Sequence, residues 1–269
     1  MIVALPCYFN HEMWLQIRGI RARYLALNTT TAEPDPEAAR ALISSRTRAI
    51  TLITPNNPTG AIYSPDCIER FLAVAREAGI ALIVDETYRD FMDASAVPHR
   101  LFQQPDWRDT FVHLYSFSKA FSLTGFRVGA IAAGPALREA LSKIQDCTAI
   151  CAPHPSQLAA LYGLRHLQTW KRMVCDQLVA RANAIRSAFE EPSLRYSLLS
   201  AGAYFAYARH PFDDTARNVA RRLAQEFGVI CLPGSYFGDG QEQYLRIAFA
   251  NLEDNRFPEL VDRLVASQG

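Results

Sequence analysis

Short runs of β-branched and apolar residues alternate with amphipathic stretches through the first half of the chain. Such alternation predicts strands of a mostly parallel sheet, joined by helices that cover its faces. Ser64 and Pro65 open one amphipathic stretch and Gly79 ends it, so that they predict the cap, first turn and end of a helix. The predicted strands are Ile2–Leu5, Arg23–Leu27, Ala49–Ile53, Ala81–Val84, Phe111–Tyr115 and Val128–Ala132.

The pattern changes in the second half of the chain. From Leu137 to Phe189 it is mostly helical, with a break near 152–155, and is typical of a connector between two lobes. The later runs predict a smaller α+β lobe. Its predicted strands are Ala203–Ala208, Val229–Leu232 and Tyr244–Phe249, and its predicted helices are Asp214–Phe227 and Asn255–Ser267. We therefore expect a large domain over 1–150, and a connecting helix with a small domain over 151–269.

Composition and charge narrow the function classes. With 49% hydrophobic and 11% aromatic residues, the 269-residue chain has the composition of an ordinary globular protein. Lys and Arg number 28 against 27 Asp and Glu, without a basic run, so we expect no nucleic-acid partner. We find no apolar stretch of about 18 residues and no signal peptide, so we expect no membrane partner and a cytoplasmic location. The cysteines lack metal-ligand spacing, and we expect reduced, buried thiols and no metal site.

Two polar clusters follow predicted strands at the carboxyl end, where open α/β sheets bind ligands. The segment Thr54–Gly60 is rich in Asn and Pro, and an ordinary turn explains it equally well. Asp85 follows an apolar run, with Tyr88 three residues later. A carboxylate there is costly unless it is paired, so we expect a cationic partner, while a helix N-cap is the alternative.

Two further clusters place cations in apolar surroundings. Lys119 ends the run Ser116-Phe117-Ser118-Lys119 after a predicted strand, and Arg127 follows eight residues later. A partly desolvated lysine has a lowered pKa and attacks carbonyl groups as the free amine. Arg246 interrupts an apolar strand-like run, where it is either an outward-facing residue or a buried fork for a carboxylate.

Together these clusters resemble the class I and II aminotransferases, which are pyridoxal phosphate (PLP) enzymes of fold type I. The Asn-Pro-Thr-Gly turn, Asp-x-x-Tyr, Ser-x-Ser-Lys and the arginine beyond the lysine stand in that family's order and approximate spacing. The resemblance runs from about Pro6 to the C-terminus. It implies an α/β fold of type I, a mostly parallel sheet flanked by helices with a smaller α+β C-terminal domain, and transfer of an amino group between an amino acid and a 2-oxo acid.

The resemblance also implies roles for the residues around the cofactor ring. Lys119 would bind the cofactor aldehyde as an imine and then move a proton between the substrate Cα and the cofactor C4′. Asp85 would pair with the pyridine nitrogen and keep it protonated, so that the ring accepts electrons. Asn57 and Tyr88 would hydrogen-bond the ring O3′. Tyr8 falls where the family stacks an aromatic ring on the pyridine.

Two further sets of contacts follow from the same resemblance. Ser116, Ser118 and Arg127 would hold the cofactor phosphate through hydroxyl groups and a charged fork. Arg246 would bind the substrate α-carboxylate in bidentate geometry, with Asn57 beside it. A homodimer is implied as well.

The chain departs from this family at its N-terminus. Family members are usually longer there, and carry a small-residue turn that gives backbone N–H groups to the phosphate. They also carry upstream a tyrosine that reaches the neighbouring subunit's phosphate, and a segment that closes over the substrate. We therefore expect Met1 to be an internal start.

The residues leave several functions open. β-Elimination or racemisation would use the same cofactor contacts, and an effector-binding domain or an inactive remnant would keep the same fold. No Gly-x-Gly-x-x-Gly turn follows a predicted strand, which argues against a nicotinamide enzyme. Arg246 addresses a carboxylate that all amino acids share, so the substrate side chain stays undetermined.

Overall fold

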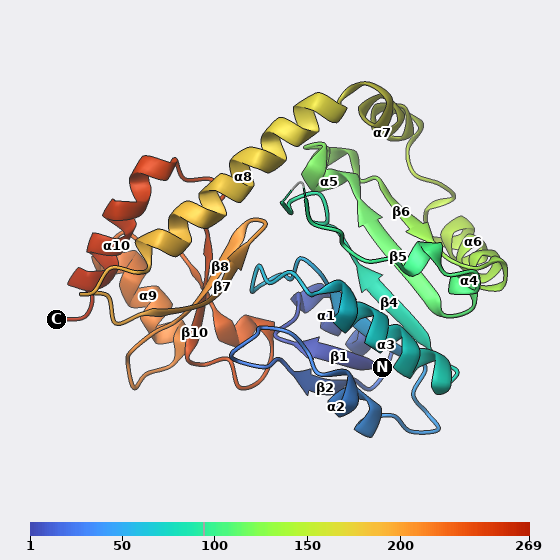
Figure 1. The fold of residues 1–269 in the computed structure, drawn as a ribbon, viewed down its shortest axis with the longest axis horizontal. Coiled ribbons are helices and arrows are strands. Elements are labelled where there is room, and N and C mark those ends of the chain that lie inside the picture. The colour runs from blue at the N-terminus through green and yellow to red at the C-terminus, as the bar shows by residue number, and fades with distance from the viewer. Residues whose placement is uncertain (94) are drawn as a thin grey trace.

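The computed structural model describes residues 1–93 and 95–269 and contains two sheets joined by a long helix (Figure 1). A six-stranded sheet with helices around it occupies the N-terminal part, and a four-stranded antiparallel sheet with two helices occupies the C-terminal part. The expected fold class, a mostly parallel α/β sheet followed by a smaller α+β part, is confirmed.

The six-stranded sheet has the order β2-β1-β3-β4-β5-β6, in which β6 pairs antiparallel with β5 and the other pairs are parallel. The chain moves from β1 to one side to form β2, and then to the other side for β3, β4 and β5. The carboxyl ends of β1 and β3 therefore flank a switch point, where such sheets bind ligands. The strands are β1 (Ile2–Leu5), β2 (Arg23–Ala26), β3 (Ala49–Ile53), β4 (Ala81–Asp85), β5 (Phe111–Ser116) and β6 (Gly129–Ala132).

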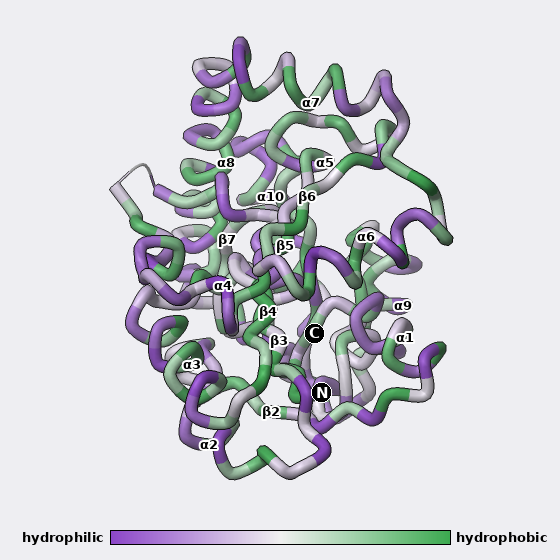
Figure 2. Tube along the Cα trace, turned by 90° about the vertical axis from the view of Figure 1, so that its right-hand side faces the viewer, coloured by the Kyte–Doolittle hydropathy of each residue, from purple (hydrophilic) through white to green (hydrophobic). Residues whose placement is uncertain are grey.

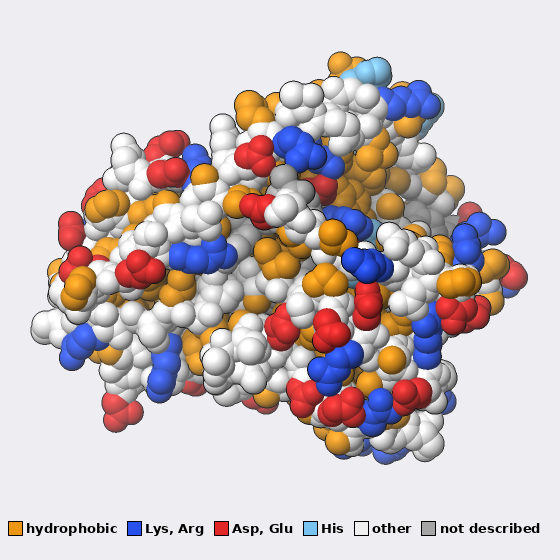
Figure 3. Space-filling view, viewed as in Figure 1, with side chains coloured by type: hydrophobic (Ala, Val, Ile, Leu, Met, Phe, Trp, Pro, Cys, Tyr) orange, Lys and Arg blue, Asp and Glu red, His pale blue; other side chains and the backbone are white. Residues whose placement is uncertain are grey.

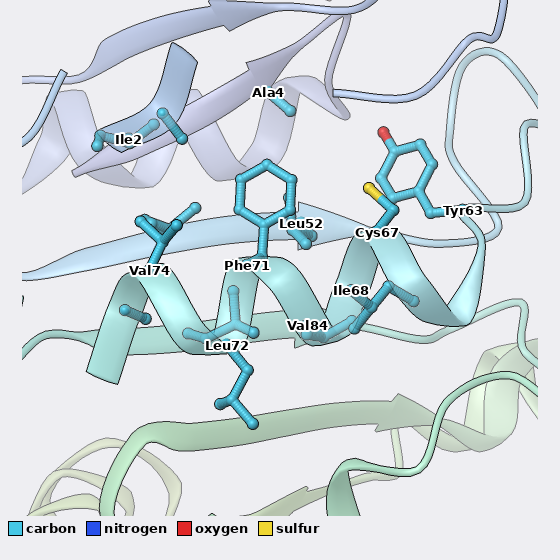
Figure 4. Close-up of a cluster of buried hydrophobic side chains, with 14 of the residues drawn as sticks. Ile2, Ala4, Leu52, Tyr63, Cys67, Ile68, Phe71, Leu72, Val74 and Val84 are labelled. Carbon is cyan, nitrogen blue, oxygen red and sulfur yellow. The ribbon is translucent and has the colours of Figure 1, made fainter. Parts of the chain in front are cut away.

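The central strands β3 and β4 are mostly apolar, as their largely green tubes show in Figure 2. Helix α3 (Pro65–Glu77) covers one face and inserts Phe71, Leu72 and Val74 toward the sheet (Figure 4). The Ser64 hydroxyl caps α3 by accepting from Cys67 N–H at 3.2 Å, which confirms the predicted cap. The other helices around this sheet are α1 (Phe9–Ile17), α2 (Pro36–Ala41), α4 (Trp107–Thr110), α5 (Phe117–Ala120) and the 3₁₀ turns Leu101–Gln103 and Thr124–Phe126.

The connector consists of α6 (Pro135–Ala149), α7 (His154–His166) and α8 (Gln168–Ala188), and α8 runs from the first sheet to the second (Figure 1). The second sheet has the order β7-β8-β10-β9. Its strands are β7 (Ser197–Gly202), β8 (Phe205–Arg209), β9 (Leu232–Pro233) and β10 (Tyr244–Ala248). Helices α9 (Ala216–Glu226) and α10 (Phe257–Ala266) pack on it, and 3₁₀ turns span Gly234–Phe237 and Asp254–Arg256.

Several predicted elements need correction. The predicted strand Ala203–Ala208 begins two residues too early: Phe205–Ala208 lie in β8, while Ala203 adopts a left-handed φ of 48° in the turn between β7 and β8. Of the predicted strand Val229–Leu232, Leu232 alone lies in β9, while Val229 is buried in the core beneath it. Helices α1 and α2 were not predicted, and the connector has a second break at Leu167.

The surface offers no single-signed charge patch in the view of Figure 3, where acidic and basic side chains intermingle over α2 and α3. Ion pairs such as Arg40 with Glu37 account for this mixture. The expectation of buried thiols is wrong for Cys147 and Cys151, which are exposed at the end of α6 and beyond it. Among the described residues, none of the helices has both the length and the apolar character needed to cross a membrane.

Candidate active site

One cavity of about 580 Å³ opens at the carboxyl ends of β3, β4 and β5 and receives residues from β10 as well. Its size lies in the range of sites for small molecules and cofactors. Every site residue that the sequence predicted lines it. These residues are Tyr8, Asn57, Asp85, Tyr88, Ser116, Ser118, Lys119, Arg127 and Arg246.

Asp85 is the last residue of β4, and its carboxylate is held from both sides. His11 Nε2 of α1 lies 3.0 Å from Oδ2, and Thr87 donates to Oδ1 from its backbone N–H at 3.0 Å and its hydroxyl at 2.7 Å. Burial by itself would raise the pKa of Asp85, but these hydrogen bonds and the charge of His11 hold that pKa below its usual value. The partner that the structure gives to Asp85 is therefore the His11 ring, which is a cation only when it is protonated. The N-cap alternative is wrong, because a turn rather than a helix follows Asp85.

Lys119 lies in α5, half-buried between aromatic rings. Its Nζ is 5.8 Å from the ring centroids of both Tyr88 and Tyr204. Burial, together with the positive charges of Arg127 and Arg246, lowers the pKa of Lys119. A lowered pKa makes the free amine available as a nucleophile and base at lower pH than on an exposed lysine.

The lysines of the chain are Lys119, Lys143 and Lys171. Lys143 pairs with Glu139 at 2.9 Å on the exposed face of α6, and Lys171 pairs with Asp90 at 2.6 Å. Within residues 1–93 and 95–269, Lys119 has no such carboxylate partner. Of the three amines, that of Lys119 is the one held unpaired in a cavity.

The end of β5 and the turn after α5 bring hydroxyl groups and a cation to the same cavity. Ser116 caps α5 by accepting from Ser118 N–H at 3.2 Å, and the Ser118 side chain is buried. Arg127 adopts a left-handed φ of 52° and donates from Nη1 to Thr124 O at 2.7 Å. This conformation is costly for a residue with a side chain, and such strain is common where a side chain must be aimed at a ligand.

Arg246 reaches the cavity from β10, and the second sheet thereby contributes to the site. Its Nη1 donates to Asn57 Oδ1 at 2.9 Å, and the guanidinium lies over the rings of Phe205 and Phe237 at 4.4 Å and 4.9 Å. Arg246 Nε is buried without a protein partner among the described residues, and burial lowers the pKa of Arg246. Arg246 therefore faces the cavity rather than the outer surface, and its role as a fork for a carboxylate stays a prediction.

Tyr8 lies at the N-terminus of α1, three residues before His11. The two rings meet edge to face with centroids 6.5 Å apart, and Asn10 Nδ2 donates to the Tyr8 hydroxyl at 3.1 Å. Tyr88 is buried, which raises its pKa. Aromatic groups thus line the cavity from α1, from the loop after β4 and from the β7–β8 hairpin.

Sequence reasoning missed several residues of the site. His11 stands three residues after Tyr8, a spacing that places both on one side of a helix, but α1 was not predicted. Thr87 lies inside the Asp-x-x-Tyr motif of Asp85 and Tyr88. An aspartate often accepts hydrogen bonds from the residue two positions later, and this pattern could have indicated Thr87. The others come from segments with no motif. They are Asn10, Ile53, Thr124, Tyr204, Phe205 and Leu232.

The donor set fits pyridoxal phosphate. The cavity provides a buried, paired carboxylate, a partly desolvated amine, and an arginine with two hydroxyl groups, which match a pyridine nitrogen, an aldehyde and a phosphate. The unpartnered Nε of Arg246 leaves a donor for a further anionic group. Within the part of the chain that the structure describes, no group of three or more His, Cys, Asp or Glu side chains is arranged to hold a metal ion.

Comparisons with known proteins agree with this donor set. The family described as aminotransferase class I and II matches residues 1–264. The aromatic aminotransferase ISS1 of Arabidopsis thaliana is 31% identical over 93% of this chain and 64% of its own length. An aspartate aminotransferase of Sulfolobus acidocaldarius is 25% identical over 98% of this chain and 68% of its own length. The chain thus spans about two thirds of the length of these relatives.

Solved structures show the same fold. The aromatic aminotransferase of Pyrococcus horikoshii superposes with a TM-score of 0.89 at 22% identity, covering 99% of this chain and 72% of its own. An aspartate aminotransferase double mutant of Thermus thermophilus gives a TM-score of 0.86 at 22% identity, covering 98% and 69%. The family match over residues 1–264 shows that the chain belongs to the class I and II aminotransferases.

Proposed function

We propose that this chain carries the cofactor site of a PLP-dependent aminotransferase, which moves an amino group between an amino acid and a 2-oxo acid. Class I and II aminotransferases depend on PLP. When bound, PLP supplies an acceptor for the electrons released as a bond to the substrate Cα breaks. The observation that carries the proposal is the unpaired, partly desolvated amine of Lys119 in the same cavity as the paired carboxylate of Asp85.

Lys119 would hold the cofactor covalently and then act as the base. Its lowered pKa supports both roles, because each requires the free amine. As the base, Lys119 Nζ would take up the proton from the substrate Cα. The rings of Tyr88 and Tyr204 would restrict the conformations of the Lys119 side chain and thereby the position of Nζ.

Asp85 would hold a proton on the pyridine nitrogen. This role requires an ionised carboxylate in a buried place, and the hydrogen bonds from His11 and Thr87 support it. His11 would thereby act on the ring through Asp85, without touching the ring nitrogen itself.

The remaining cofactor contacts would come from three directions. Ser116, Ser118 and Arg127 would bind the phosphate, since they combine hydroxyl donors with a permanent positive charge. Asn57 and Tyr88 would bind the ring oxygen O3′. Tyr8 would pack on the ring face as an aromatic surface.

Arg246 would bind the α-carboxylate of the amino acid. Its planar fork orients the substrate, and the bond to Asn57 supports that geometry before the substrate arrives. The α-carboxylate is common to amino acids, so the proposed substrate class is amino acids and 2-oxo acids without a particular side chain.

The proposal includes the organisation of the protein. We place the domain division at residue 150, since β1 to β6 precede it and β7 to β10 follow it. A cytoplasmic homodimer is part of the proposal on the family resemblance. Exposed apolar side chains on α6 and α7 support an interface there, among them Ile144, Leu158 and Tyr162.

The experiment is an absorbance titration of the purified chain with PLP, followed by a panel of amino acids. A band for the covalent linkage should form with wild-type protein and not with Lys119→Ala, and some amino acids should convert it to the pyridoxamine form. A folded wild-type protein that forms no such linkage would contradict the proposal for this chain.

A further inference from the structure

Lys171 of α8 lies behind the cavity rather than in it. Its ammonium pairs with Asp90 Oδ1 at 2.6 Å, and the two side chains are only 21% and 14% exposed. Asp90 belongs to the loop after β4 and is separated from Lys171 by 81 residues along the chain. A partly buried pair of this kind is screened little by solvent, and the loss of one partner leaves the other charge unpaired.

Asp90 also ties this pair to β5. Its second oxygen, Oδ2, accepts a 2.6 Å hydrogen bond from the Tyr115 hydroxyl. Tyr115 directly precedes Ser116, and Asp90 stands two residues after Tyr88. Both oxygens of one carboxylate are therefore used to join the Tyr88 loop to the end of β5.

Lys171 contacts a third segment of the site. Its Nζ lies 5.4 Å from the ring centroid of Phe121, the residue that follows α5 and stands two positions after Lys119. Phe121 packs in the same buried cluster as Tyr88 and Phe117. One ammonium group thus touches, directly or through Asp90, the segments that carry Tyr88, Ser116 and Lys119.

The other end of α8 is anchored to the second sheet. Arg181 donates from Nη1 to Ala250 O at 2.6 Å and pairs with Asp254 at 3.2 Å. These contacts hold the loop that follows β10, the strand of Arg246. Helix α8 therefore connects the rear of the Lys119 segment to the strand that carries the proposed carboxylate fork.

We infer that Lys171 is a positioning residue of the site, which holds the Tyr88, Ser116 and Lys119 segments together through Asp90 and Phe121. It does not contact the cavity that would receive the cofactor. The effect of Lys171 on catalysis rests on the proposed function. The ordering of the three segments does not, because it can be measured in the protein without cofactor. Lys143 provides a control for Lys171, because it also pairs with a carboxylate but does so on the exposed surface of the protein.

The test compares Lys171→Met with Lys171→Arg, Asp90→Asn and the control Lys143→Met. Amide hydrogen exchange of the cofactor-free proteins is measured by mass spectrometry. Lys171→Met and Asp90→Asn should speed exchange in 86–93 and 117–127 and leave α3 unchanged, while Lys171→Arg and Lys143→Met should match wild type. The dissociation constant of PLP should rise about tenfold in Lys171→Met. In this variant the two segments are disordered before binding, so that PLP binding has to offset the entropy lost when they become ordered.

Unchanged exchange in both segments of Lys171→Met would overturn the inference. A uniform rise that includes α3 would overturn it too, since it would mean a general loss of stability. Failure of wild-type protein to bind PLP is a separate outcome that contradicts the proposed function, and the exchange comparison still decides whether Lys171 orders these segments.

Discussion

Arg246 Nη1 donates a 2.9 Å hydrogen bond to Asn57 Oδ1, although 189 residues separate the two along the chain. Arg246 lies in β10 of the second sheet, and Asn57 lies in the turn after β3 of the first. The bond thus joins the two sheets across the cavity. It also holds the Arg246 guanidinium in place before a ligand arrives, so that less side-chain entropy is lost when the ligand binds.

Replacing Arg246 by lysine should separate substrate binding from cofactor binding. Lysine keeps the charge but loses the planar fork, so we expect the KM for amino acids to rise by about tenfold to a hundredfold with little change in PLP affinity. Spectroscopic titration of the cofactor-free protein with PLP measures the PLP affinity, and the rate of the PLP-loaded protein at a series of amino-acid concentrations measures the KM. The exposed Arg209→Lys on the neighbouring strand β8 is the control. An equal loss of PLP binding would mean that Arg246 serves the cofactor rather than the substrate.

Removal of His11 should change the pH range of the site. The pKa of Asp85 lies below its ordinary value in the folded protein. The stability that the ionised Asp85 contributes is therefore present above the ordinary carboxyl pKa, and it is lost as the pH falls through the folded-state pKa. Without His11 the pKa of Asp85 rises, and in His11→Phe the acid limb of amino-acid turnover should move to higher pH. A pH profile of the half-reaction measures this shift. An unchanged acid limb would show that His11 does not control the ionisation of Asp85.

Glu86 should make the fold sensitive to acid. Its carboxylate is 1% exposed and lies 3.1 Å from His99 Nε2; burial would raise its pKa, but His113 and His99 lower it to about 2 from 4.5. The depressed pKa stabilises the fold above about pH 4.5, by about 3 kcal/mol, and this contribution disappears as pH falls toward 2. Glu86→Gln should lower the free energy of unfolding at pH 7 and flatten its acid dependence.

Urea unfolding at a series of pH values measures that dependence. Glu77→Gln is the control, because Glu77 forms a surface pair with Arg40 and should have little effect. The same acid slope in wild type and Glu86→Gln would refute a buried charge on Glu86.

The close packing of Gly60 against Gly202 should help to hold the turn that carries Asn57 in position. Gly60 has a φ of 72°, and a Cβ there would lie 2.4 Å from Gly202 N. Gly60→Ala should therefore lose more stability than Gly79→Ala, which has a φ of 63° and open space, and costs about 1 kcal/mol through its backbone alone. Thermal unfolding and PLP titration compare the two variants, and equal losses would mean that the contact with Gly202 is not tight.

The strand ends of the site could be predicted from the sequence for a physical reason. Parallel strands end on one edge of a sheet, so Asn57, Asp85 and Ser116 had to lie near one another once β3, β4 and β5 were recognised. The order of motifs then supplied Lys119 and Arg127. All of these residues line the one cavity.

The remaining parts of the site depend on contacts that no local pattern encodes. Helix α1 exposes Met13, Trp14 and Ile17, so its sequence shows no clean apolar face and His11 could not be placed. The β7–β8 hairpin turns at Ala203, a residue with no turn preference, and Tyr204 was therefore assigned to a strand. The bond from Arg246 to Asn57 joins two sheets, which only tertiary packing brings together.

The central claim is that Lys119 binds PLP covalently, and the small number of lysines allows a direct measurement. The protein is incubated with PLP, reduced with borohydride, digested and mapped by mass spectrometry, so that the modified lysine carries a stable label. The account predicts the label on Lys119, and none on the ion-paired Lys143 and Lys171. A label on Lys143 or Lys171, or equal labelling of all three, would contradict it.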